Sequence, residues 1–153
     1  MLRMSKLADY GTVVMTYIAL APEKVHSAHD IASRVHVGLP TVSKILKILA
    51  RQELLVSVRG AKGGYTLARP ARKISIAEII DAMEGPVGLT ECSSAPGLCV
   101  QESSCSIRAN WQKINRAVRR ALETMSLAEM ARPIAHPVRF DTLRAPAASR
   151  RAA

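Results

Sequence analysis

The chain of 153 residues contains few aromatic side chains, because phenylalanine, tryptophan and tyrosine make up only 3% of it. Proteins that bind single-stranded nucleic acid usually stack the bases on aromatic rings, so this mode of binding is not expected. Long apolar runs are also missing, and none approaches the roughly 18 residues that a membrane-spanning helix needs. These two absences argue against a single-strand binder and against a membrane protein.

Acidic residues are in the minority, because 22 lysine and arginine residues stand against 12 aspartate and glutamate residues. A formal net charge of +10 on so small a chain favours a polyanionic partner. The basic excess falls mainly in residues 1–85 and 135–153. With so few aromatic residues, we expect that partner to be double-stranded DNA; the alternative is a merely basic soluble protein.

Cysteine is scarce: Cys92, Cys99 and Cys105 are the three cysteines of the chain, and they lie in one short segment. An odd number of clustered thiols does not resemble a disulfide framework and suits a reducing compartment, so we expect a cytoplasmic protein. The apolar stretch 10–21 resembles a secretory signal. Asp9 interrupts its basic start, however, and its apolar residues recur at helical spacing, which favours a packed first helix.

Residues 1–85 have the pattern of a winged helix-turn-helix domain. Capping residues and apolar periodicity predict four helices, which begin after Ser5, after Ser27, at Pro40 as the first helical residue, and after Ser75. Between the third and fourth helices, alternating apolar residues flank the glycine-rich stretch 60–64 and predict a β-hairpin. We expect the third helix to enter the major groove and the hairpin to form the wing.

The remaining chain divides into three parts. Residues 86–104 lack periodicity and are predicted to form a loop that carries two of the cysteines. Residues 105–132 are predicted to form a long dimerisation helix that begins near Cys105, followed by a short last helix capped by Ser126. The long helix has an apolar seam at coiled-coil spacing: Ile107, Trp111, Ile114, Val118, Ala121 and Met125. Residues 133–153 are expected to be a disordered tail, and the expected fold class is mainly α with a small β wing.

The third helix carries polar side chains opposite its apolar stripe. Hydroxyl and ammonium groups suit contacts with phosphates and base edges, and cations on the hairpin can reach a flanking groove or the backbone. We expect six side chains to contact DNA: Thr41, Ser43, Lys44, Lys47, Arg59 and Lys62. The alternative is a solvated charged face on a small helical bundle, which the order of helices, glycine turn and hairpin disfavours.

The three thiols are separated by six and five residues on one loop, which can wrap a metal centre. Thiolates select zinc, copper or iron-sulfur clusters, so an iron-sulfur cluster, zinc and a redox-sensing thiol all stay open on the residues alone. A fourth ligand must come from elsewhere, and Arg108 is excluded because a guanidinium stays protonated. Each histidine alone is expected at the surface, and the possible donors are Asp9, Glu91, Glu102, His26, His29, His36 and His136.

Together these residues resemble the winged-helix iron-sulfur regulators that include IscR and NsrR, the Rrf2 family. The resemblance spans residues 1–132, and its specific parts are Ser5-Lys6, Ile31-Ala32, the wing 59–67, the three cysteines and Trp111. It implies a homodimeric, sequence-specific transcription regulator, expected to be a repressor, that binds a DNA operator and has no catalytic activity and no small-molecule substrate. The opening residues 4–10 are most similar to regulators of the SUF iron-sulfur assembly operon.

The resemblance also implies that Cys92, Cys99 and Cys105 hold a 2Fe-2S or 4Fe-4S cluster. IscR-like members place a histidine ligand where this chain has Arg108, so the chain departs from that mode of ligation. NsrR-like members take an aspartate from the first helix of the partner subunit, and Asp9 falls at that position, so we expect Asp9 to be the fourth ligand. The alternatives are a cluster-free thiol or zinc regulator on the same scaffold and, from another class, a small metalloenzyme.

Overall fold

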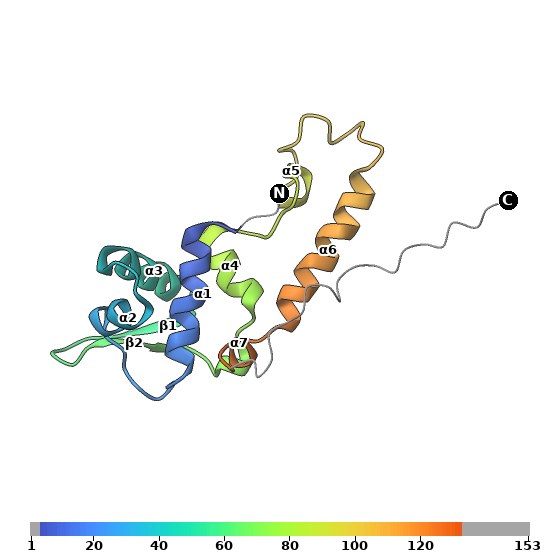
Figure 1. Ribbon diagram of the computed structural model, residues 1–153. Coiled ribbons are helices and arrows are strands. Elements are labelled where there is room, and N and C mark those ends of the chain that lie inside the picture. The colour runs from blue at the N-terminus through green and yellow to red at the C-terminus, as the bar shows by residue number, and fades with distance from the viewer. Residues whose placement is uncertain (1–3, 133–153) are drawn as a thin grey trace, which may run out of the picture.

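The computed structural model describes residues 4–132, so the expected tail, residues 133–153, and His136 lie outside the described residues. The described chain is mostly helical with one small sheet (Figure 1), which confirms the expected fold class. In chain order, the elements are α1 (Lys6–Ala19), α2 (Ala28–Val35), α3 (Leu39–Arg51), β1 (Leu55–Val58), β2 (Gly64–Leu67), η1 (Ala71–Lys73), α4 (Ile76–Glu84), α5 (Glu91–Ser94), α6 (Arg108–Thr124) and α7 (Leu127–Met130). Within residues 4–132, no helix is both long and apolar enough for a membrane span.

Serine side chains fix the start of four helices. Ser5, Ser27, Ser75 and Ser126 each accept a hydrogen bond from the backbone amide three residues further on. Each bond satisfies an amide that the first turn of a helix leaves without a partner. The last two serines complete a capping box with the glutamate three residues later. The starts predicted for α1, α2, α4 and α7 are therefore confirmed.

The core lies around α1, which packs against α2, α3, α4 and α7. The apolar stripe predicted for α3 is buried in this core, as are residues from every neighbouring helix. The core includes Val14, Met15, Ile18, Ile31, Val42, Ile45, Leu46, Leu49, Ile79 and Leu127. With its apolar stripe held in this way, α3 has its opposite, polar face toward solvent.

The hairpin is antiparallel, with Leu55 opposite Leu67 and Val58 opposite Gly64. Its second strand is fixed to the connection between α1 and α2, because two backbone hydrogen bonds join His26 and Tyr65, at 2.9 and 2.8 Å. These bonds bring the chains so close that a Cβ added at Gly64 would lie 2.3 Å from the His26 carbonyl oxygen. Glycine is required here by close backbone approach.

Replacing Gly64 with alanine is expected to destabilise the protein by about 1–3 kcal/mol, because the wing must shift away from backbone atoms that cannot yield. Chemical denaturation followed by circular dichroism measures this change. Gly38→Ala is the matched control, since a Cβ there would meet nothing closer than 3.9 Å, and we expect it to cost less than about 1 kcal/mol. Equal, small effects of the two substitutions would show that the wing is not held in this way.

Two helix starts differ from the prediction. The first residue of α3 is Leu39, so Pro40 is its second helical residue. The long helix α6 begins at Arg108 rather than near Cys105, because the Arg108 amide donates to the Cys105 carbonyl at 3.3 Å and closes a turn before the helix. Cys105 therefore lies outside the first turn of α6.

The segment predicted as a loop over residues 86–104 contains one short helix, α5. The carbonyl of Thr90 accepts hydrogen bonds from the amides of Ser93 and Ser94, at 2.9 and 3.1 Å. No residue of α5 is buried, so no apolar periodicity marks this turn in the sequence. The rest of the predicted loop is irregular.

Candidate functional site

The outer face of α3 gathers four of the side chains expected to contact DNA. Lys44 and Lys47 are exposed, and Thr41 and Ser43 are half-buried. Neither lysine forms an ion pair within residues 4–132. A shallow hollow on this face is lined by Pro40, Ser43, Lys44, Lys47, Ile48 and Arg51. The lysines thus stand on a rigid helix with their charges available to an external anion.

Arg51 belongs to the same surface, although it is not among the six side chains predicted to contact DNA. It is exposed at the end of α3 and lines the hollow with Lys44 and Lys47. The spacing of three and four residues between these cations places them on one face of a helix. This spacing is visible in the sequence and could have identified Arg51. Three cations in one row suit contacts with phosphates.

Arg59 and Lys62 lie at the exposed tip of the hairpin, which projects beyond α2 at the left of Figure 1. Gly60 adopts a φ of 118°, which favours glycine, and its carbonyl accepts a hydrogen bond of 2.9 Å from the Gly63 amide. The turn is therefore closed at its tip and fixed at its base by the bonds to His26. Two cations project from a defined turn, on the same domain as the basic face of α3.

The three cysteines lie on the connection from α4 to α6, and all are free and half-buried. The Cys92 thiol is 3.3 Å from the Thr90 hydroxyl, and Cys99 lines a shallow hollow beside Glu102. Within residues 4–132, no group of three His, Cys, Asp or Glu side chains is arranged to hold a metal. The structure thus does not bring the thiols together with Asp9, and their shared metal centre stays a prediction.

We call residues 86–107 the cysteine segment. In the described structure it buries none of its residues. A polar contact near its end joins the Arg108 guanidinium to the Glu102 carboxylate, whose other oxygen accepts a hydrogen bond of 2.6 Å from the Gly97 amide. Long connections without a core of their own are uncommon in compact domains and are often functional. Apart from Val87, which packs against the core, rearranging this segment would disturb little apolar packing.

His26 is buried rather than exposed as expected, with 1% of its surface accessible. Its Nε2 lies 2.9 Å from the Ala21 carbonyl oxygen, and its ring meets that of Tyr17 edge-on at 5.4 Å. The side chain is therefore part of the winged domain and is not available to the cysteines. It fixes the connection to which the wing is attached.

Two of the carboxylates considered as a fourth metal ligand differ in their surroundings. Glu102 is already paired with Arg108 and Gly97. Asp9 is exposed in the first turn of α1, and its carboxylate makes no ion pair with any residue in the described range 4–132. Asp9 is thus the freer of the two carboxylates.

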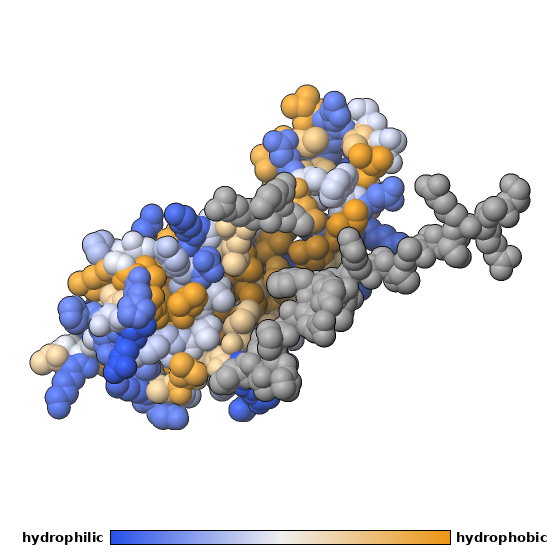
Figure 2. All heavy atoms as spheres, viewed as in Figure 1, coloured by the Kyte–Doolittle hydropathy of each residue, from blue (hydrophilic) through white to orange (hydrophobic). Residues whose placement is uncertain are grey.

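The predicted apolar seam of α6 is largely exposed. Ile107, Trp111, Ile114 and Met125 each expose more than a third of their surface, and Asn115 is the one residue of α6 that the described structure buries. Figure 2 shows apolar side chains along α6 and between α6 and the winged domain. An exposed apolar stripe of this kind is typical of an interface.

Two short helices, the second with a basic outer face, followed by a basic hairpin, define a winged-helix DNA-binding protein. Residues 4–133 match the Rrf2 family, which is described as iron-dependent transcriptional regulators. The chain belongs to this family and is a DNA-binding transcription regulator.

Curated relatives and solved structures agree with this assignment. Protein rrf2 of Nitratidesulfovibrio vulgaris is 29% identical over 132 residues, which cover 86% of this chain and 88% of that protein. The regulator IscR of Xenorhabdus nematophila is 30% identical over 132 residues, covering 86% and 80% of the two chains. The structure of CymR, the global cysteine regulator of B. subtilis, matches with a TM-score of 0.69 at 26% identity and covers 86% of this chain and 97% of its own. T. potens IscR matches with a TM-score of 0.67 at 28% identity, covering 84% and 85%.

These relatives are regulators, so the metalloenzyme alternative is set aside. They include both IscR proteins and a cysteine regulator.

Proposed function

We propose that the chain is a homodimeric, sequence-specific regulator whose operator affinity depends on an iron-sulfur cluster held by Cys92, Cys99 and Cys105. The observation that carries the proposal is the placement of three free thiols on a segment without a core. That segment joins the DNA-binding domain to the helix with the exposed apolar seam. A ligand that orders it is thus well placed to influence how two subunits present their DNA-binding surfaces.

The chemistry of the donors fits this cofactor. Cysteine thiolates are the usual ligands of iron-sulfur clusters, and the three thiols here are unpaired and partly accessible. The cysteine segment buries no residue, so bringing the thiols together costs little packing. Asp9 would supply the fourth ligand from the partner subunit, as the family resemblance implies. When bound, the cluster supplies an oxidation-sensitive cross-link between these residues.

We infer that two copies of the chain pair through α6. The exposed residues of its seam, Trp111, Ile114 and Met125 among them, can pack against the same residues of a second copy as in a coiled coil. A winged-helix dimer must present its two recognition helices about one helical turn apart, roughly 34 Å. Any change in the angle between α6 and the winged domain would alter this spacing and hence the operator affinity.

We further propose that the operator lies before genes of the SUF iron-sulfur assembly system and that the protein represses them. The similarity of residues 4–10 to regulators of that operon supports this target. A regulator that binds an iron-sulfur cluster, the product of the SUF system, can adjust the expression of that system to the supply of clusters. The operator sequence itself is found by selecting fragments from random DNA with the purified protein.

Purification without oxygen tests the proposed cofactor. We expect brown protein with bound iron and acid-labile sulfide, and a change in operator affinity when the cluster is removed. Colourless protein without iron, or protein with stoichiometric zinc, would contradict the proposal. DNA binding by such protein would leave a cluster-free thiol or zinc regulator on the same scaffold.

The same preparation tests Asp9. In Asp9→Ala we expect the cluster to assemble but to decay faster in air, because one ligand is lost while three thiolates remain. The decay of visible absorption gives the rate. Glu91→Ala removes the exposed carboxylate of a competing candidate ligand, on α5, and serves as the comparison. Decay at the natural rate in Asp9→Ala, or faster decay in Glu91→Ala alone, would exclude Asp9 as the ligand.

A further inference from the structure

Three polar side chains hold the base of the cysteine segment, and we call Asp81, Asn115 and Arg119 the polar joint. Asn115 Oδ1 accepts a hydrogen bond from the Leu89 amide at 3.0 Å, and its Nδ2 donates to the Val87 carbonyl at 3.2 Å. Asp81 Oδ1 accepts from the Val87 amide at 3.1 Å. Arg119 Nη2 donates to Asp81 Oδ2 at 2.8 Å. The joint therefore connects α4, the cysteine segment and α6.

The burial of Asn115 points to an orienting role. It is 8% exposed, and a buried amide is costly unless its polar atoms find partners. Both ends of this amide bind backbone groups of the cysteine segment rather than groups within α6. An apolar residue would fill the same place if packing alone were needed. Asn115 instead fixes the backbone of Val87 and Leu89 at a defined height along α6.

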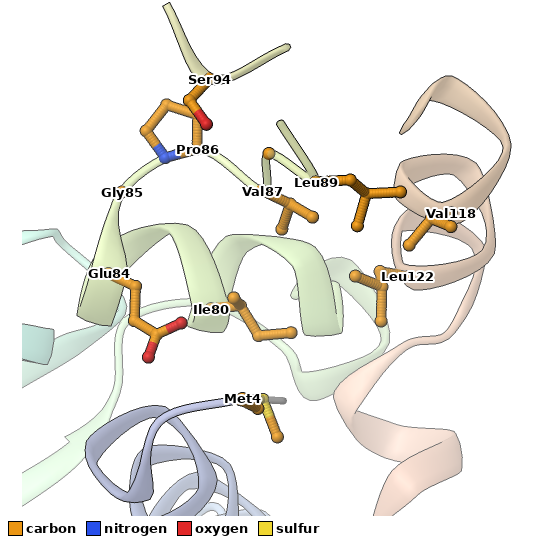
Figure 3. Close-up of a pocket in the computed structure, with 11 residues that line it drawn as sticks. Met4, Ile80, Glu84, Gly85, Pro86, Val87, Leu89, Ser94, Val118 and Leu122 are labelled. Carbon is orange, nitrogen blue, oxygen red and sulfur yellow. The ribbon is translucent and has the colours of Figure 1, made fainter. Parts of the chain in front are cut away.

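Apolar packing between α4 and α6 is incomplete beside the joint. Figure 3 shows Val87 and Leu89 between the two helices, next to Val118 and Leu122 of α6. These residues border a hollow of about 460 Å³ that is also lined by Met4, Ile80 and Glu84. Fewer close-packed side chains therefore hold α6 on this side than in the core. The hydrogen bonds and the ion pair of the polar joint thus contribute to the angle between α6 and α4.

We propose that the polar joint couples the cysteine segment to the angle between α6 and the winged domain. This inference rests on the proposed function, since it names the residues through which the state of the thiols reaches the DNA-binding surface. Leu89, held by Asn115, lies three residues before Cys92. A displacement of Cys92 therefore displaces the backbone of residues 87–89, which is bonded to α6 through Asn115 and to α4 through Asp81. The three side chains are positioning residues.

The coupling is measured as the ratio of operator affinities of cluster-loaded and metal-free protein, by fluorescence anisotropy. For the natural chain we expect a ratio of about 5- to 150-fold, the usual range of coupling between two sites. In Asn115→Ala and in Arg119→Ala the ratio should fall to within about twofold of unity, with iron and sulfide content unchanged. Arg120→Ala is the matched control, because Arg120 neighbours Arg119, is exposed and has no ion pair among residues 4–132. It should keep the natural ratio.

A second measurement does not depend on the cluster. Amide hydrogen exchange of Val87 and Leu89 in metal-free protein should become faster in Asn115→Ala and Arg119→Ala, while exchange within α1 to α3 stays unchanged. If Asn115→Ala does not fold, Asp81→Ala, which removes the acceptor of the Val87 amide, and Arg119→Ala give the same two readouts.

The outcomes separate the two proposals. A natural affinity ratio in the joint variants, or an equal loss of the ratio in Arg120→Ala, would overturn the coupling. If the natural protein holds no cluster, the proposed function is refuted, and amide exchange at Val87 and Leu89 alone then tests whether the polar joint holds the cysteine segment. Unchanged exchange in the variants would refute that role of the polar joint.

Discussion

Cys99→Ala is expected to lose its bound iron and visible absorption and to remain a folded dimer. Cys99 is half-buried on the cysteine segment, which contributes no residue to the core, so removing its thiol leaves the winged domain and the seam of α6 intact. A centre with two of its three thiolates is not expected to survive isolation. Iron analysis, circular dichroism and size-exclusion chromatography after oxygen-free purification measure the three properties.

Ser103→Ala is the matched control for this experiment. Ser103 lines the same shallow hollow as Cys99 but offers no soft ligand, so this variant should stay brown. A Cys99→Ala protein with its full natural colour would show that Cys99 is not a ligand. If Cys99→Ala fails to fold, the thiol has a structural role, contrary to what its place on a segment without buried residues indicates.

Arg59→Ala is expected to weaken operator binding by about 1–3 kcal/mol if the guanidinium reads a base. If it contacts a phosphate instead, Arg59→Ala should weaken binding to all DNA sequences. The slope of log affinity against log salt concentration should then fall by about one, because about one counterion fewer is released on binding. Arg59 is exposed at the tip of a turn and has no ion pair within the described residues, so its removal should not disturb the fold. Anisotropy titrations at several salt concentrations, with a fragment that the natural protein binds, distinguish these cases.

Arg72→Ala controls for the loss of one positive charge. Arg72 is exposed on η1, which belongs neither to the hairpin nor to α3. Like Arg59, it forms no ion pair within residues 4–132. We expect its removal to change affinity little. Equal effects of the two substitutions would show that Arg59 acts only through the net charge of the protein.

Much of the winged domain could be predicted from local features. The serine caps of α1, α2 and α4 act through hydrogen bonds to amides three residues away, so the residues that form them are close in sequence. The apolar stripe of α3 follows from helical spacing in the same way. Both signals are complete within one element, and both are confirmed.

The features that could not be predicted depend on residues far apart in the chain. The backbone of His26 is bound by Tyr65 of the distant hairpin, and the sequence around His26 does not predict that its side chain is buried. Asn115 stands in a polar stretch of α6 and is buried only because residues 87–89 lie against it. In the same way, the position of the thiols relative to Asp9 is not encoded locally, since residues 90–107, which carry the thiols, place no apolar side chain in the core.

The attachment of the wing limits how one subunit can adapt to different operators. Because Gly64 and Tyr65 lie directly against His26, the hairpin and the start of α2 are held as a single unit. If α3 and the wing contact DNA as we propose, the separation between their contacts within one half-site is therefore constant. Operators that tolerate extra base pairs should do so at their centre, between the two half-sites, and never within either of them.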